Sequence, residues 1–377
     1  MSSLRANLFL VALGLSLLGL VMVYSAAGTG SLFERIVHMV LGVAVFLVAS
    51  RIRYTAWRKY APALYVIVLI GLILVLIPGV GSRINGARRW LDLGLMTVQP
   101  AEFAKLAAVL LLSCAVARLP SGSRLPFKPL AMVGVLFALV FIEPDFGTSV
   151  IVLSGAAGVL WASEIRTRDL VLSGLVGLVA VAGMMMLEPY RRERFTTFLN
   201  PWAATDGSGY QIVQSMVAIK AGGLFGSGAG SGGQGPYVPE VGTDMIFALV
   251  GEELGLLGMV AVIAAFGFIA LAGLRIALGA PTVMARCVAA GLTTMLTVQA
   301  IFNIGAVMVV LPLAGMTLPF VSDGGSSLLV CFAAVGILYR ISEDSERARE
   351  TKPRANKNPH SRRRHGGARY PRAVRGG

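Results

Sequence analysis

The sequence is poor in charged side chains. Only 14% of its 377 residues are Asp, Glu, Lys or Arg, whereas 56% are hydrophobic and the mean hydropathy is +0.75. A soluble globular domain carries about 25% charged residues. Long apolar runs recur from end to end, and we find none of the short alternating strands that an outer-membrane barrel requires. The composition therefore predicts an all-α polytopic membrane protein.

Cysteine is scarce as well. The three cysteines all lie in apolar segments, at Cys114, Cys287 and Cys331. An odd number of cysteines, none of them in a loop, excludes a disulfide framework and a cysteine-based metal knuckle. The sequence also lacks an internal repeat, a dinucleotide-binding fingerprint and any folded nucleic-acid-binding motif, so nucleic acid is not an expected partner.

Apolar windows of about 20 residues predict about ten transmembrane helices. The first resembles a signal peptide, but its apolar run is longer and a second span follows soon, so we expect an uncleaved helix. The predicted spans are 7–27, 33–50, 60–78, 99–117, 129–143, 147–164, 169–187, 243–274, 284–310 and 325–341.

The basic residues of the short loops predict the orientation. Alternate loops, such as the stretch RIRYTAWRK at 51–59, carry Lys and Arg, and they share a side with the basic end of the chain. Both termini are therefore expected in the cytoplasm, with a large extracytoplasmic loop at 188–242 between spans seven and eight. We predict a membrane domain over 1–342 and a basic, disordered cytoplasmic tail over 343–377. Such a tail is suited to contact with anionic lipid headgroups.

Two outer segments break this charge rule. One is GSRINGARRWLDLG, with Arg88 and Arg89, and the other opens with YRRERF, with Arg191 and Arg194. Arginine pairs well with phosphate, so a lipid-linked phosphate ligand is one interpretation. Contact with lipid headgroups by snorkelling side chains is the alternative for each single arginine.

The segment 188–242 is too long for a simple connector. Its middle part, 207–223, is partly amphipathic and predicts a short helix on or in the outer leaflet. A glycine run follows at 226–235, for which flexibility and close approach to a ligand are the expected uses.

Asp244 stands where this loop meets the next span. A carboxylate there can be half desolvated and still reach substrate, which suits a general base. The alternative is an acid at a helix N-terminus, with Thr243 as the cap. If the helix runs unbroken from residue 244 to 275, it is about 48 Å long. It would then project outward and carry Glu252 and Glu253 at the interface, with the nearby glycines serving helix packing.

Three further outer stretches carry polar groups. In QPAEFAKL, Glu102 and Lys105 are three residues apart and can pair, either as structural glue or as a polar cavity wall. In EPDFGTS, Asp145 is expected to cap the next helix. The turn LPLAGMTLPFVSDGGSSLL is irregular at membrane depth, so it should be buried or line a cavity. It contributes three candidate substrate-binding serines: Ser322, Ser326 and Ser327.

The stretches QPAEFAKL, EPDFGTS, RFTTFLNPWAATDGSGYQIVQS, GGLFGSGAG, VPEVGTDMIFALVGEELGLLG and GMTLPFVSDGGSSLL resemble, in order and spacing, the FtsW/RodA family of bacterial shape, elongation, division and sporulation proteins. The resemblance covers residues 7–342, and FLNPW…GYQ…QS is more similar to the division-type FtsW branch. It implies a ten-helix glycosyltransferase of the bacterial cytoplasmic membrane that polymerises lipid II. A class B penicillin-binding transpeptidase and other divisome or elongasome membrane proteins are the implied partners.

The resemblance also implies site residues. The family's essential acid corresponds to Asp244, which would act as general base on the acceptor sugar hydroxyl. Undecaprenyl pyrophosphate would leave with inversion, stabilised by Arg88, Arg89, Arg191, Arg194 and Lys105, with a divalent cation (Mg or Mn) as a further contributor.

Two departures from the family pattern and two rival functions remain. Gly242 replaces a common His, and Asp323 replaces a common Tyr. A lipid II flippase is one rival, although the polar groups gather on one face only. A non-catalytic scaffold for the transpeptidase is the other.

Overall fold

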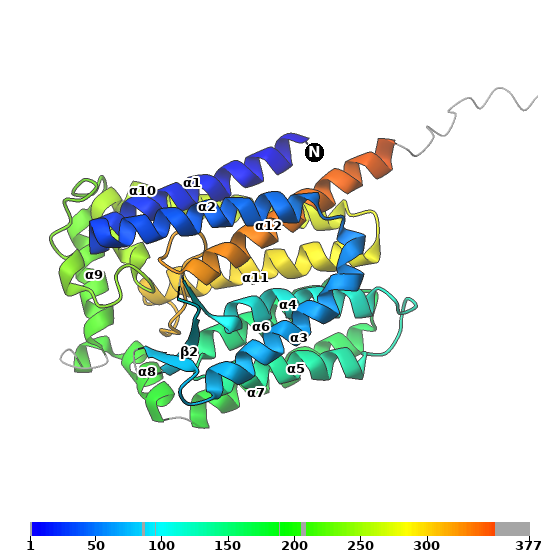
Figure 1. Ribbon diagram of the computed structural model, residues 1–377. Coiled ribbons are helices and arrows are strands. Elements are labelled where there is room, and N and C mark those ends of the chain that lie inside the picture. Colours follow the sequence, from blue (N-terminus) through cyan, green and yellow to red (C-terminus); the bar gives the residue numbers. More distant parts are fainter. Residues whose placement is uncertain (1, 85–86, 95, 188, 205–208, 351–377) are drawn as a thin grey trace, which may run out of the picture.

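The computed structural model describes residues 2–84, 87–94, 96–187, 189–204 and 209–350. Its long helices lie side by side in a bundle (Figure 1). They coincide with the predicted spans: α1 (Ser2–Ala27), α2 (Thr29–Arg51), α3 (Trp57–Leu76), α4 (Pro100–Val116), α5 (Phe127–Ile142), α6 (Phe146–Ala162), α7 (Thr167–Leu187), α10 (Ile246–Leu278), α11 (Val283–Val307) and α12 (Gly325–Glu350).

Length and composition support membrane crossing. Among the described residues, six helices are long and apolar enough to cross a membrane: α1, α2, α3, α10, α11 and α12. The apolar helices α5 and α6 are shorter. The buried core is formed largely by α4, α11 and α12, with α12 packed along α2 and α11 packed between α6 and α10. The chain is therefore a multi-pass helical membrane protein.

The long segment before α10 contains much more helix than predicted. It holds α8 (Pro189–Leu199), the 3-10 turn η2 (Pro201–Ala204), α9 (Tyr210–Gly222) and the 3-10 turn η3 (Gly235–Tyr237), so the helix expected at 207–223 is confirmed. These elements and the strands gather at one end of the bundle, away from the N-terminus and the far end of α12 (Figure 1). This end contains the candidate site.

The all-α prediction misses a small sheet. Strands β1 (Gly81–Ile84), β2 (Ala87–Asp92) and β3 (Thr97–Val98) pair antiparallel in the order β1-β2-β3. A strand edge is viable here because the segment lies outside the bundle, where backbone groups need not all be paired inside one helix. The β1–β2 register shifts here: Ser82 pairs with Trp90 and Arg83 pairs with Arg88, which leaves Arg89 as the extra residue of the ladder.

Helix α12 continues past the predicted domain boundary at residue 342 and ends at Glu350. Ion pairs explain this extension. Arg340 pairs with Glu343 at 3.1 Å and with Asp344 at 3.0 Å, and Arg347 pairs with Glu343 at 2.6 Å. Pairs three and four residues apart stabilise a helix. The rest of the predicted tail, 351–377, lies outside the described residues.

The predicted unbroken helix over 244–275 is wrong. Helix α10 begins at Ile246 and breaks at Gly255, whose backbone is left-handed with φ 65°. Normal helical bonds would join the carbonyls of Glu252 and Glu253 to amides four residues on. Instead these carbonyls accept bonds from the amides of Ser227 and Gly228, both at 3.0 Å.

The glycine-rich loop and the residues before it also supply hydrogen-bond acceptors on the far side of this break. The amides of Leu256 and Leu257 donate to the carbonyls of Gly223 and Leu224, at 2.9 and 3.3 Å. A side chain at Gly226 would collide with the backbone of Glu253. Gly226 therefore allows a close approach, as the sequence predicted. The backbone that approaches it belongs to α10, whereas the sequence pattern predicted a ligand. A helix interruption is tolerated in a membrane protein where other groups satisfy its backbone.

Candidate active site

Asp244 lies in the turn before α10 and is half-buried. Three consecutive backbone carbonyls fix this turn. That of Gly242 accepts from the Asp323 amide at 2.8 Å, and that of Thr243 accepts from the Ser322 hydroxyl at 2.6 Å. The carbonyl of Asp244 itself accepts from the Asn303 amide nitrogen Nδ2 at 2.8 Å. The turn is therefore held by α11 and by the 311–325 segment, which supplies the two other donors.

Thr243 does not cap α10, contrary to the alternative considered for this turn. The residue that precedes the helix is Met245, and the Thr243 hydroxyl donates to Glu240 Oε2 at 2.9 Å. The side chain of Asp244 is thus not committed to a cap bond. Its Oδ2 lies beside Gly315, where a methyl group would come within 3.4 Å of it.

The surroundings of Asp244 raise its pKa to about 6. Desolvation by burial is the main cause, and the negative charge of Glu240 acts in the same direction. The positive charge of Arg194 opposes them, and smaller effects of Asp145 and Arg89 follow. A carboxylate with a pKa near 6 is mostly ionised at neutral pH and is a stronger base than an exposed one.

Two of the four predicted arginines stand close to this carboxylate. Arg89 donates from Nε to the Glu143 carbonyl at 3.1 Å and from Nη2 to the Pro144 carbonyl at 2.6 Å. Arg194, on α8, lies 3.5 Å from the Leu313 carbonyl. It lines a pocket whose other walls are Phe146, Phe195, Phe302, Pro312, Leu313 and Ala314. Phosphate oxygens entering this region would meet two fixed guanidinium groups.

The other two arginines are not brought to this point. Arg88 pairs across the sheet with Arg83 of β1, whereas Arg89 falls at the register shift between the two strands. The side chain of Arg191 lies outside the described part of the structure.

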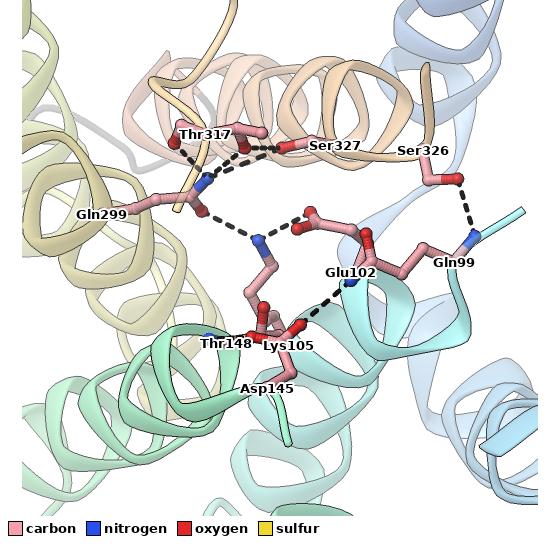
Figure 2. A network of polar contacts seen from close by, with 9 residues as sticks. All are labelled: Gln99, Glu102, Lys105, Asp145, Thr148, Gln299, Thr317, Ser326 and Ser327. Carbon is pink, nitrogen blue, oxygen red and sulfur yellow. Dashed lines mark hydrogen bonds and ion pairs between the residues drawn. The ribbon is translucent and has the colours of Figure 1, made fainter. Parts of the chain in front are cut away.

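A second polar cluster lies at the start of α4 (Figure 2). Lys105 is 1% exposed; its Nζ lies 2.6 Å from Glu102 and donates to Gln299 at 2.8 Å. Gln299 in turn donates to the Thr317 carbonyl at 3.0 Å. The predicted pairing of Glu102 and Lys105 is confirmed, but the lysine is aimed into the bundle between α4 and α11.

The three candidate serines all have partners inside the protein. Ser322 donates to Thr243 and accepts from the Leu318 amide at 2.7 Å. Ser326 accepts from the Gln99 amide at 3.0 Å, and Ser327 shares a 3.0 Å bond with Thr317. The hydroxyls of Ser322 and Ser327 join the 311–325 segment to its neighbours, and that of Ser326 joins α12 to the start of α4.

The turn between α5 and α6 contributes two acids. Asp145 accepts from the Thr148 amide at 3.0 Å, which confirms the predicted helix cap, and from Gln99 Nε2 at 3.0 Å (Figure 2). Glu143 is 1% exposed, and its carboxyl oxygens have no hydrogen-bond partner among the described residues. Burial, reinforced by Asp145, raises the pKa of Glu143 to about 9 against the opposing effect of Arg89. Glu143 is therefore neutral at physiological pH.

Glu252 and Glu253 hold the glycine-rich loop. Glu252 Oε1 accepts from the Gln234 amide at 2.7 Å, and Glu253 Oε2 accepts from the Gly230 amide at 3.0 Å. Glu253 also accepts from the Ser25 hydroxyl of α1. This acidic pair fastens the loop onto the broken helix.

Sequence reasoning missed several residues that shape the site. Gln299 and Asn303 are four residues apart in the apolar span of α11, and polar groups at that spacing share one helix face. That signal could have marked them. Gly315 offered no such pattern, since it approaches Asp244 from a distant part of the chain. Glu240 is close in sequence, but it lies in a turn, where spacing does not predict contacts.

Metal ligands do not converge in this region. Among the described residues, no group of three or more His, Cys, Asp or Glu side chains is arranged to hold a metal ion. The predicted divalent cation thus has no ready-made protein site in the described part of the chain.

Comparisons with known proteins point in one direction. The FTSW_RODA_SPOVE family model, described as "Cell cycle protein", matches residues 5–347. The sequence is 37% identical over 353 residues to stage V sporulation protein E of Bacillus subtilis. It is 38% identical over 364 residues to a probable peptidoglycan glycosyltransferase FtsW of Coxiella burnetii. Both matches cover 90% of this chain and 96% of the relative.

Solved structures agree. The rod shape determining protein RodA of Thermus thermophilus is similar with a TM-score of 0.68 and 28% identity, over 90% of this chain and 96% of that one. A chain from a structure described as "Structural coordination of polymerization and crosslinking by a peptidoglycan synthase complex" has a TM-score of 0.76 and 29% identity. That match covers 90% of this chain and 97% of the other.

Proposed function

The chain belongs to the FtsW/RodA/SpoVE family of cell cycle proteins, and from this we propose that it is a peptidoglycan glycosyltransferase that polymerises lipid II, with Asp244 as its general base. The environment of one carboxylate carries the assignment of the base. Asp244 is half-buried, its turn is fixed by hydrogen bonds to three backbone carbonyls, and two arginines stand nearby. Family relatives are named peptidoglycan glycosyltransferases.

The proposed topology has ten spans, α1–α7 and α10–α12, in the bacterial cytoplasmic membrane. Both termini are cytoplasmic, which agrees with the basic short loops. Helices α8 and α9, the sheet and Asp244 are then on the outer face. This arrangement gives lipid II access from the outer leaflet, with its pyrophosphate at the level of the outer arginines.

In the proposed reaction the Asp244 carboxylate takes the proton of the acceptor sugar hydroxyl. The hydroxyl oxygen attacks the anomeric carbon of the donor sugar, and the bond from that carbon to the pyrophosphate oxygen breaks with inversion. The pyrophosphate leaves with the electron pair, and Arg89 and Arg194 stabilise its charge. Asp244 then releases its proton to water. Neutral Glu143 supports this step, since a second carboxylate charge would repel the leaving group.

Other predicted site residues receive supporting roles in this proposal. Lys105 with Glu102, and the three serines, hold α4, α11 and the 311–325 segment together. Arg88 is assigned to contact with headgroups. A divalent cation, where one takes part, would be carried mainly by the pyrophosphate oxygens, because the described side chains offer no complete ligand set.

The test compares wild type with Asp244→Asn in lipid II polymerisation, in liposomes and with the cognate class B transpeptidase present. Asp92→Asn is a matched control, because Asp92 is an exposed acid at the end of β2. Loss of glycan only in Asp244→Asn, with folding and partner binding intact, supports the base. Equal glycan in wild type and Asp244→Asn contradicts it.

The same preparation separates the rival functions. If the protein is a scaffold, the wild-type protein should recruit the transpeptidase but should itself make no glycan. A flippase should move labelled lipid II between leaflets without polymerising it, and Asp244→Asn should block that movement. Neither rival explains a carboxylate of raised pKa beside two arginines as directly as glycosyl transfer does.

A further inference from the structure

Arg35 is the largest fully buried side chain that lies outside the site described above. It sits on α2 with 0% exposure. Burying a guanidinium group is costly unless it is hydrogen-bonded and its charge is balanced. Nη2 donates to the Phe320 carbonyl at 2.5 Å and to the Val321 carbonyl at 3.2 Å, whereas Nε and Nη1 have no partner among the described residues. The structure thus uses Arg35 to bind the backbone of one short segment.

That segment has a strained backbone. Phe320 has φ 66°, a left-handed conformation that bulky residues rarely adopt. Such strain persists only where the surroundings hold it, and it is common at functional sites. The ring of Phe320 packs edge-on against Phe332, with centroids 5.5 Å apart. Arg35 binds the carbonyl of the strained residue itself. Its hydrogen bond and the ring contact with Phe332 together hold Phe320 in this conformation.

The restrained segment leads directly to the proposed base. Ser322 and Asp323 follow Val321, and they donate to the carbonyls of Thr243 and Gly242 at 2.6 and 2.8 Å. These carbonyls immediately precede Asp244. A continuous set of contacts therefore runs from α2 through residues 320–323 to the turn that carries the carboxylate.

We propose that Arg35 is a positioning residue for glycosyl transfer, which fixes residues 320–323 and through them the turn of Asp244. This inference rests on the proposed role of Asp244. Arg35 does not touch substrate; it acts through the backbone. Asp323 interacts with the same guanidinium: burial raises the pKa of this acid, and the positive charge of Arg35 opposes that rise.

Helix α1 supplies an independent test of the same contact. A methyl group at Gly19 would collide with the Val321 carbonyl and lie 2.9 Å from Arg35 Nη2. Gly19→Ala therefore separates Arg35 from the segment without changing any charge. Gly14 is on the same helix, and a methyl group there would meet no atom of the described chain within 4 Å. Gly14→Ala is thus the matched control.

The experiment measures kcat and KM for lipid II polymerisation in Arg35→Met, Gly19→Ala, Gly14→Ala and Asp244→Asn. Misplacing a catalytic group by about 1 Å can cost on the order of 100-fold in rate. We expect kcat to fall by about 100-fold in Arg35→Met and about tenfold in Gly19→Ala. KM should stay near the wild-type value, and Gly14→Ala should match wild type. Thermal unfolding and transpeptidase binding establish that each variant is folded.

The pH profile adds a result that a general loss of stability would not produce. The charged groups facing Asp244 are Glu240 from its own turn, Arg194 from α8, Asp145 from the α5–α6 turn and Arg89 from β2. None of these changes in Gly19→Ala. A looser turn admits water to Asp244, so the acid limb of its pH profile should move to lower pH.

Each outcome decides the proposal. Folded Arg35→Met with kcat within about threefold of wild type overturns it, as does a rise in KM with unchanged kcat. Equal losses in Gly19→Ala and Gly14→Ala also overturn it. If Arg35→Met does not fold, the comparison of the two glycine variants gives the answer. Polymerisation by Asp244→Asn would refute the base itself, whereas an inactive Asp244→Asn beside a fully active Gly19→Ala refutes only the role of Arg35.

Discussion

The electrostatics of Asp244 make a prediction with opposite signs for two single substitutions. With a pKa of about 6, the carboxylate is about half ionised at pH 6 and about nine-tenths ionised at pH 7. The rate should follow this fraction. Glu240 raises this pKa and Arg194 lowers it. Glu240→Gln should therefore move the acid limb of the pH profile down, and Arg194→Gln should move it up.

The two shifts differ in size because the two residues differ in exposure. Glu240 is exposed, so solvent screens its charge and the limb should fall by a few tenths of a pH unit. Gln retains the oxygen that accepts from Thr243, so the turn keeps its shape. Arg194 is half-buried, and its loss should raise the limb by about one pH unit. At neutral pH that change would leave roughly half of Asp244 ionised.

The assay is kcat/KM for lipid II polymerisation from about pH 5 to about pH 8, at low and at high salt. Glu193→Gln on α8 is the matched control, because it removes one exposed acid that does not contribute to the pKa of Asp244. The shift in Glu240→Gln should shrink at high salt. The electrostatic account of the base would be refuted if the acid limbs of Glu240→Gln and Arg194→Gln moved in the same direction. An equal shift in Glu193→Gln would refute it as well.

Three further results are expected. Arg89→Met should lower kcat by about tenfold or more, whereas Arg88→Met, which removes a charge that does not act on the pKa of Asp244, should stay within about threefold of wild type in the polymerisation assay. Gly226→Ala should lower the thermal unfolding temperature because its methyl group strikes the backbone of α10, whereas Gly233→Ala meets no described atom within 4 Å and should not. Glu143→Gln should change the pH dependence of stability. The folded state holds this proton with a pKa of about 9, so wild type should lose about 1.4 kcal/mol per pH unit from about pH 4.5 to about pH 9. The Gln variant should lack that slope in thermal unfolding measured in detergent, and an unchanged slope would contradict the neutral state of Glu143.

The sequence alone predicted the structure correctly wherever the determining contacts are between residues close in the chain. Apolar runs predicted the positions of the long helices because burial in hydrocarbon depends on consecutive residues. The pairing of Glu102 with Lys105 and the cap made by Asp145 each span three residues, and helix geometry fixes such neighbours.

Contacts between distant segments account for what the sequence could not predict. The break at Gly255 depends on hydrogen bonds from residues 223–228, and without them an apolar run of that length indicates one helix. The small sheet was not predicted from the sequence, because the arginines of this segment were interpreted by their charge alone. Glu252 and Glu253 suggested an interfacial acidic pair, yet their partners are amides of the glycine-rich loop.

The two departures from the family pattern illustrate which contacts tolerate substitution. Gly242 contributes its carbonyl oxygen and Asp323 contributes its amide nitrogen to one 2.8 Å hydrogen bond. Any residue other than proline can provide that donor, and every residue can provide that acceptor. Replacing the common His and Tyr therefore leaves the support of Asp244 intact. The conformational demand falls instead on Phe320 and on the buried Arg35 that binds its carbonyl. Retention of polymerisation should thus depend more on Arg35, deep in α2, than on the two altered positions beside the base.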